Sequence, residues 1–223
     1  MKRLTFYILT LLLASASAFA ADADQRLYTG IAENNLAAVE LAIAGGAYLN
    51  KTYDNDLTPL MNALSVPHTD IRLIRRLISS GADARYIAPD GNTPLLLALQ
   101  TSASPETLQL LLNAGANPNL ANKEGYTPLL TALTHSQTPE TIEILLNAGA
   151  DANHPARLGG NPLYPLTAAV ALNAPRETIL LLLKNSNQDA GFQALTAAIA
   201  DDNEEMQKLL LEHNKKQKKQ PAL

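Results

Sequence analysis

The heptapeptide TPLLLAL at residues 93–99 recurs in related form along the chain. The other copies are TPLMNAL at 58–64, TPLLTAL at 127–133 and the weaker YPLTAAV at 164–170. The first three copies begin 35 and then 34 residues apart. Self-similarity at a fixed period of this length indicates a stack of like supersecondary units rather than a single enzyme core. The repeat therefore predicts a protein that works through its surface.

A glycine-alanine pair follows the same period. Its glycines are Gly46, Gly81, Gly115 and Gly149, spaced by 35, 34 and 34 residues, and Asp or Asn follows the last three pairs. Glycine at the end of a helix adopts a left-handed conformation that a side chain resists. We therefore expect each glycine to end one helix and to begin the loop to the next unit.

In the unit at residues 90–122, the heptapeptide and the glycine-alanine pair predict two helices. Thr93 suits a helix N-cap and Pro94 suits the first helical position, where its missing N–H costs nothing. Ser104 is predicted to cap a second helix with an apolar stripe at intervals of three and four residues. Gly115 ends this helix, so the unit is a loop followed by an antiparallel helix pair.

The other units follow this plan with changes. Asp70 is predicted to cap a helix over residues 71–80, and Thr138 is predicted to cap its counterpart two units later. The helix over residues 178–184 has no closing glycine. Asn185-Ser186-Asn187 stands there, and we expect an asparagine to take the left-handed conformation.

Helix pairs are also expected at both ends, over residues 25–34 and 36–45 and over residues 192–200 and 203–213. The chain then contains six pairs. An end pair must hide one open face of the stack and present the other face to water. The residues predicted to form this polar outer side are Asp201, Asp202, Glu204, Glu205 and Lys208.

The pattern T-P-L-x-x-A, an apolar second helix and G-A-[DN]-x-N together resemble the ankyrin repeat, a turn and two antiparallel helices in about 33 residues. The resemblance covers about residues 23–213 and is strongest over residues 54–153. It implies an all-α solenoid of about six stacked helix-turn-helix units with short hairpin loops. It also implies binding through the hairpin tips and the concave faces of the first helices.

The predicted segments are a signal peptide at 1–20, a repeat domain at 21–213 and a basic tail at 214–223. The tail is interpreted either as a flexible end or as a segment that makes a weak electrostatic contact. The repeat domain is predicted to comprise a cap at 23–50, repeats at about 54–86, 88–120, 122–153 and 154–187, and a cap at 189–213.

One departure from the family concerns the residue after T-P-L, which is usually a histidine that joins neighbouring loops by hydrogen bonds. Met61, Leu96, Leu130 and Thr167 stand at this position. We therefore expect the polar brace to be missing and apolar packing to replace it.

The N-terminus resembles a secretory signal peptide. Lys2 and Arg3 precede an apolar stretch at residues 4–13, and Ala18-Phe19-Ala20 offers an A-x-A cleavage site. An uncleaved membrane anchor is the alternative, although the apolar run is short for a bilayer span. We expect export to a bacterial periplasm, with no stable membrane insertion after cleavage.

The composition narrows the classes of partner. The 223 residues include no cysteine, which excludes a disulfide framework and a thiolate metal site. Without Lys2 and Arg3, 15 basic and 21 acidic residues remain, a net charge of −6. A mildly acidic surface disfavours nucleic acid and anionic lipid as the main partner.

The sequence contains no recognisable catalytic, cofactor-binding or metal-binding constellation. Its four histidines, His68, His135, His154 and His213, are isolated in the sequence, and the common metal, nucleophile and phosphate-loop motifs are missing. We expect a protein that is not an enzyme and that has no cofactor and no metal.

Tyrosines mark the segments that link successive units. Tyr48, Tyr53, Tyr86, Tyr126 and Tyr164 all lie in such links. Aromatic rings are effective interface anchors because they offer a large contact area with few rotamers to freeze. Alternatively, each ring packs on the adjacent hairpin for stability, and both interpretations remain open.

The link from Gly149 to Pro165 covers 16 residues, three more than the 13 of the other links. The extra residues are predicted to form a flexible protrusion. Insertions in repeat arrays map to loops on one face, which is often the binding face, so this protrusion is a candidate for partner specificity. Tolerated drift is the alternative. Partner-binding candidates in and beside this insertion are His154, Arg157, Leu158, Asn161 and Tyr164.

The concave lining is predicted to include Asn62, Leu97, Gln100, Thr131 and Thr134. This neutral surface suits a protein or peptide partner. We therefore expect a non-catalytic protein-binding scaffold in the periplasm, monomeric alone, with an unknown partner. The alternatives are an immunity or inhibitor protein that neutralises a toxin or enzyme in the periplasm, and an envelope stress-tolerance factor.

Overall fold

The computed structural model describes residues 22–52, 56–158, 161–200 and 203–217. The predicted signal peptide and Tyr53 lie outside these residues. The chain divides into two compact units, Met1–Ala88 and Pro89–Leu223.

The first unit contains two helix pairs. A helix over residues 22–32 is followed by α2 (Leu36–Ala44), and α3 (Pro59–Ser65) is followed by α4 (Ile71–Ser79). Within the unit, α3 packs on α4 and α2 packs on α4. The second helices of the two pairs therefore stack on each other.

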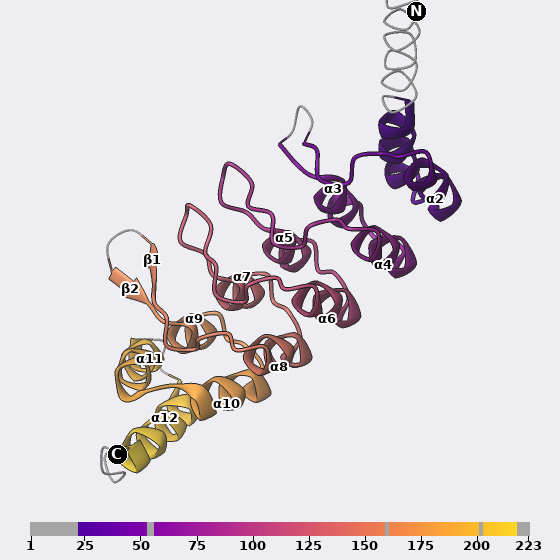
Figure 1. The fold of residues 1–223 in the computed structure, drawn as a ribbon. Coiled ribbons are helices and arrows are strands. Elements are labelled where there is room, and N and C mark those ends of the chain that lie inside the picture. The colour runs from indigo at the N-terminus through magenta and orange to yellow at the C-terminus, as the bar shows by residue number, and fades with distance from the viewer. Residues whose placement is uncertain (1–21, 53–55, 159–160, 201–202, 218–223) are drawn as a thin grey trace, which may run out of the picture. The chain divides into compact units, whose positions relative to one another are not determined.

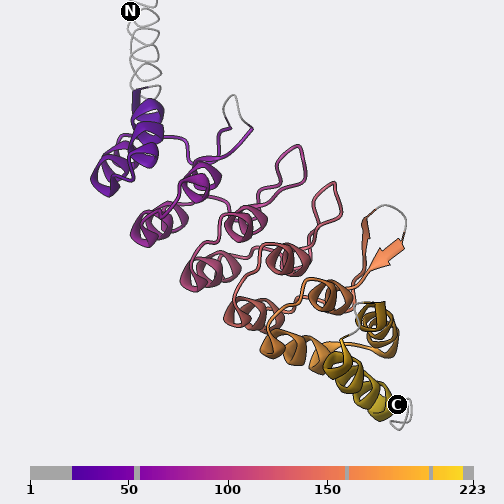
Figure 2. The same cartoon turned by 180° about the vertical axis from the view of Figure 1, so that it is seen from behind.

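The second unit continues the plan through four helix pairs and a β-hairpin. The first helices stack in one row, α5 on α7, α7 on α9 and α9 on α11, and α6, α8 and α10 form a second row (Figure 1). Figure 2 shows both rows from behind, with the loops of this unit extending from the row of first helices. The elements are α5 (Pro94–Gln100), α6 (Pro105–Asn113), α7 (Pro128–Thr134), α8 (Pro139–Asn147), β1 (Ala156–Leu158), β2 (Asn161–Leu163), α9 (Pro165–Ala171), α10 (Arg176–Asn185), α11 (Gln188–Ala200) and α12 (Glu204–Gln217).

The predicted helix starts are confirmed by their caps. The hydroxyl oxygens of Thr58, Thr93 and Thr127 each accept a hydrogen bond from the backbone N–H three residues later, at 3.2–3.3 Å. Ser104 caps α6 in the same way. Tyr164 precedes α9 without a side-chain cap bond, so this helix relies on Pro165 at its first position. The described residues thus form six helix pairs, and the predicted all-α repeat class is confirmed.

The residue after T-P-L is an apolar core residue in three of the units. Met61, Leu96 and Leu130 are 0–1% exposed, whereas Thr167 is half-buried. Apolar packing at this position is therefore confirmed where the side chain is apolar.

A left-handed residue occurs in the turn between the two helices of a pair. Its φ angle lies between 51° and 56° in each case. None of these residues is glycine, so the sequence pattern did not predict the conformation; short polar side chains tolerate it better than most. The residues are Asn34, His68, Ser102, Ser136 and Asn173.

The prediction of a left-handed asparagine after α10 was wrong. Ser186 has an extended backbone (φ −95°, ψ 145°), and neither Asn185 nor Asn187 has a positive φ. The Ser186 hydroxyl donates to the carbonyl of Leu182 at 2.7 Å. α11 begins at Gln188, only a few residues after α10 ends. The long loop that follows the second helix in the other units is therefore replaced here by a short connection, which does not use a left-handed residue.

The C-terminal helix extends further than predicted. α12 continues to Gln217 instead of ending at His213, and Asn214, placed in the predicted flexible tail, is buried at 6% exposure. Gly191 of α11 faces it so closely that a Cβ there would clash with its Oδ1. Packing against α11 therefore orders the first residues of this basic segment.

Candidate protein-binding surface

Asparagine side chains hold successive loops together within each unit. In the second unit, the Asn119 amide donates to the carbonyl of Gly149 at 2.8 Å and accepts from the N–H of Asp151 at 2.7 Å. Asn153 makes the same pair of bonds one repeat later, to the carbonyl of Asn185 (2.9 Å) and the N–H of Asn187 (2.6 Å). We call this pair of bonds the asparagine bracket.

The first unit contains the same bracket. The Asn50 amide donates to the carbonyl of Gly81 at 2.9 Å and accepts from the N–H of Asp83 at 2.8 Å. Each bracket satisfies one acceptor and one donor at the end of the next helix, where backbone groups otherwise lack partners. The bracket therefore fixes the spacing between the loops that would meet a partner.

Asn153→Ala is expected to lower the free energy of unfolding by about 1–3 kcal/mol, because a carbonyl and an N–H lose their partner together. Urea denaturation followed by far-UV circular dichroism measures the loss. Asn147→Ala is the matched control, since Asn147 is exposed at the end of α8. Equal effects of the two changes would contradict a stabilising bracket.

A second polar brace joins the loop tips of the second unit. The N–H of Lys123 donates to the carbonyl of Asp90 at 3.1 Å, and the Asn122 amide donates to Oδ1 of Asn92 at 3.2 Å. Gly91 lies between these contacts with φ +84°. The loss of the histidine brace therefore does not leave these loops unjoined, because backbone groups and asparagines connect them instead.

The predicted tyrosine anchors are only partly accessible. Tyr86, Tyr126 and Tyr164 are all half-buried. The Tyr86 hydroxyl donates to the carbonyl of Asp56 in its own unit, at a long 3.4 Å. Each ring thus offers some surface to solvent and packs with the remainder, so both interpretations of the tyrosines fit the structure.

The insertion before α9 contains a β-hairpin. β1 and β2 pair antiparallel, with Arg157 opposite Pro162 and Leu158 opposite Asn161. The predicted insertion therefore includes paired backbone at residues 156–158 and 161–163. His154, which precedes the first of these strands, is exposed.

The candidates on the first helices differ in accessibility. Leu97 and Gln100 of α5 are half-buried and Thr134 of α7 is exposed. Thr131 is buried at 1% exposure, so its prediction as a surface residue was wrong. α7 packs between α5 and α9, and this packing encloses Thr131.

Sequence reasoning missed several exposed apolar side chains. Phe192 and Ile199 of α11 are 50% and 58% exposed, and Ile87 of the first unit is 53% exposed, whereas Tyr48, which is 59% exposed, was among the predicted link tyrosines. A spacing of seven residues along one helix could have revealed the α11 pair. Of the predicted polar outer side, Glu204, Glu205 and Lys208 are exposed and Asp201 and Asp202 lie outside the described residues.

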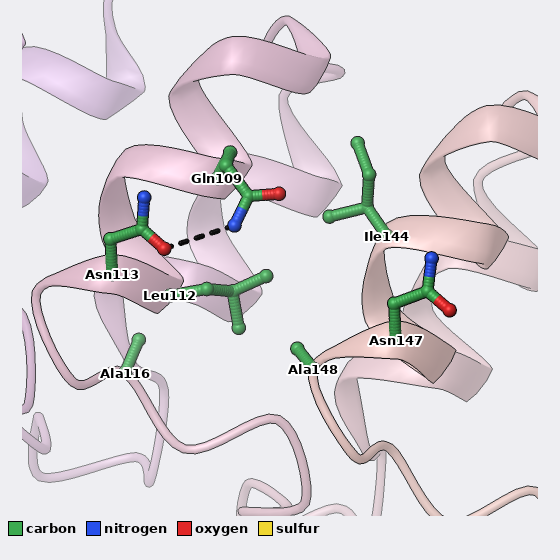
Figure 3. Close-up of a pocket in the computed structure, with 7 residues that line it drawn as sticks. All are labelled: Gln109, Leu112, Asn113, Ala116, Ile144, Asn147 and Ala148. Carbon is green, nitrogen blue, oxygen red and sulfur yellow. Dashed lines mark hydrogen bonds between the residues drawn. The ribbon is translucent and has the colours of Figure 1, made fainter.

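Two open hollows lie on the second unit. One, of about 450 Å³, runs between β2, α9 and α11 and is lined without charge by Pro162, Thr167, Gln193, Thr196, Ala197 and Ala200. The other, of about 310 Å³, lies between α6 and α8 (Figure 3) and is lined by Gln109, Leu112, Asn113, Ala116, Ile144, Asn147 and Ala148. In the second hollow the Gln109 amide donates to Oδ1 of Asn113 at 3.0 Å.

In the described residues, the surroundings shift the pKa values of Tyr28 and Asp70. Burial is the main reason that the pKa of Tyr28 rises to about 12, with Asp24 adding to the rise and a hydrogen bond with Asn62 opposing it. Hydrogen bonds from Arg72 lower the pKa of Asp70, which caps α4. The ionised Asp70 thus stands at the positive end of the helix dipole.

Among the described residues, no group of three or more His, Asp or Glu side chains could hold a metal ion. None of the helices in this part of the chain combines the length and the apolar character needed to cross a membrane.

A comparison with known protein families agrees with the geometry. A family model described as ankyrin repeats (3 copies) matches residues 27–122. The match begins in the first helix of the first unit and ends after α6 in the second unit. The caps and loop braces continue beyond it, through α7 and α8.

Proposed function

Because residues 27–122 belong to the ankyrin repeat family, we propose that this chain is a non-catalytic scaffold that binds a protein partner in the bacterial periplasm. Ankyrin repeats indicate protein–protein interaction, and such proteins are typically binding scaffolds. The contact surface we propose comprises the loop tips and the exposed parts of the first helices.

The braced loop series is the observation that carries this proposal. Asn119 and Asn153 fix one loop against the next, and half-buried Tyr126 and Tyr164 lie on the same loops. Aromatic groups on a preorganised surface lose little conformational freedom when a partner binds. This combination suits recognition of a folded or extended protein surface.

Periplasmic location rests on the sequence of residues 1–20. Cell fractionation of the expressing bacterium tests it, together with mass spectrometry of the N-terminus of the purified chain. We expect periplasmic material that begins at Ala21. Recovery of the full-length chain from the cytosol alone would contradict this part of the proposal.

Partner binding is tested by crosslinking in the periplasm and by pull-down with the purified chain. Tyr126→Ala is expected to reduce recovery of the specific partner about tenfold or more, as for an interface anchor worth about 2 kcal/mol. Tyr126→Phe keeps the ring and is expected to retain most of the recovery. Thermal unfolding of each variant verifies that the fold is intact.

The test extends to Tyr86→Ala and Arg157→Ala. Tyr86 lies on a loop of the first unit and Arg157 on the β-hairpin of the second. Unchanged recovery with all three alanine variants would show that the loop edge is not the binding surface.

A further inference from the structure

The hollow between β2, α9 and α11, within the second unit, combines apolar and hydrogen-bonding groups without charge. Its volume of about 450 Å³ falls in the usual range for ligand pockets, about 300–1,000 Å³. The lining residues are Pro162, Thr167, Gln193, Thr196, Ala197 and Ala200. None of these side chains is ionisable, so a charged ligand group would lose its hydration here without gaining a charged partner.

Thr167 introduces a buried hydroxyl into this hollow. The same position of the other repeats is apolar, with Met61, Leu96 and Leu130. The Oγ1 atom of Thr167 is buried and has no hydrogen-bond partner among the described residues, which destabilises the chain. Threonine in a helix populates two χ1 rotamers, so rotation of the side chain brings this hydroxyl to a molecule in the hollow that Thr167 lines.

Two side chains of α11 supply further hydrogen-bonding groups. Gln193 is half-buried, and its amide offers both a donor and an acceptor. The Thr196 hydroxyl donates to the carbonyl of Phe192 at 3.2 Å, and its oxygen keeps the capacity to accept. The main chain of an extended peptide presents N–H and C=O groups without charge, and these groups match such a lining.

Exposed apolar side chains flank the hollow on α11. Phe192 and Ile199 are 50% and 58% exposed. Thr196 follows Phe192 by four residues and precedes Ile199 by three, so all three residues share one face of the helix. Apolar side chains of a bound peptide would find partners on this face, while its main chain bonds to the polar groups of the hollow.

We propose that this hollow binds a short, extended and uncharged segment of the protein partner. The Thr167 hydroxyl and the Gln193 amide bond to the main chain of the segment, and Phe192 and Ile199 contact its apolar side chains. This inference rests on the proposed function, because it assigns to the partner the segment that enters the hollow.

Selection of randomised heptapeptides by display on the purified chain tests the inference. We expect the enriched peptides to be uncharged and apolar. They are expected to bind Ala197→Leu about tenfold or more weakly, because the larger side chain occupies the hollow. Ala171→Leu is the matched control, since Ala171 is exposed at the end of α9 and does not line the hollow. Absence of enrichment, enrichment of charged peptides, or equal binding by Ala197→Leu would overturn the inference.

Thr167→Val tests the hydroxyl. It keeps the shape of the side chain and is expected to weaken binding of the selected peptides about three- to tenfold, as for one lost hydrogen bond. Its Tm is expected to equal or exceed that of the wild type, because an unpaired buried hydroxyl is removed. Thr131→Val, on α7, removes another buried hydroxyl that lacks a partner in the part of the chain that the structure describes. It is expected to leave binding unchanged, and equal affinities for Thr167→Val and the wild type would contradict the role of Thr167.

Pull-down of the partner separates this inference from the proposed function. Both ideas predict loss of the partner with Tyr126→Ala, and only this inference predicts its loss with Ala197→Leu. If Ala197→Leu retains the partner whereas Tyr126→Ala loses it, the scaffold function stands and the assignment of the hollow is wrong. If neither change reduces recovery, both the hollow and the loop position at Tyr126 are excluded from the contact.

Discussion

Replacing Leu96 with alanine is expected to lower the free energy of unfolding by about 2–5 kcal/mol, the range measured for truncating a fully buried leucine. Leu96 is 0% exposed in α5 and occupies the place where related repeats have a histidine. Truncation removes apolar contacts and leaves a cavity that α5 and α7 cannot fully close. Urea denaturation followed by circular dichroism measures the loss.

The neighbouring residue provides the control. Leu97 is half-buried on the same helix, so Leu97→Ala is expected to cost about 1 kcal/mol, as most changes outside a well-packed core do. The two variants have equal helix propensity at the changed position and differ in burial. Equal losses would contradict the assignment of Leu96 to the core and Leu97 to the surface.

Gly91→Ala is expected to lower the free energy of unfolding by about 2–3 kcal/mol, because left-handed strain and a steric clash occur together. Gly91 has φ +84°, and a Cβ there would lie 2.7 Å from the backbone nitrogen of Lys123. Backbone cannot move aside as a flexible side chain can, so the bond from Lys123 to Asp90 is expected to be lost as well.

Gly149→Ala separates these two contributions. Gly149 also has a positive φ, of +90°, but a Cβ there would meet nothing within 4 Å. Its substitution is expected to cost only the left-handed strain, about 1 kcal/mol. Thermal unfolding of both variants makes the comparison, and a Gly149→Ala loss as large as that of Gly91→Ala would contradict the clash.

The features that the sequence predicted correctly are those that depend on local chemistry. Thr93 caps α5 because its hydroxyl reaches a backbone N–H three residues away, and this requires no knowledge of the rest of the fold. Asp70 caps α4 for the same reason. Gly115 takes a positive φ because the helix end demands it there.

The features that the sequence missed depend on what packs nearby. Thr131 has the same helical position as Leu97, yet Thr131 is buried and Leu97 is half-buried. The exit of α10 looked like a helix-to-loop boundary, but α11 begins at once at Gln188. The loop brace through Asn92 and Asn122 joins residues 30 positions apart, and a local pattern does not specify such a pair.

The position of Asn153 has a practical consequence for protein engineering. Its amide bonds to the next repeat, and the β-hairpin begins only afterwards, at Ala156. The three extra residues of this link therefore follow the residue that holds the two repeats together. A foreign peptide grafted between the two strands should therefore leave the helical framework unchanged. The protein could then serve as an interchangeable display platform, in which insert length is chosen independently of the support.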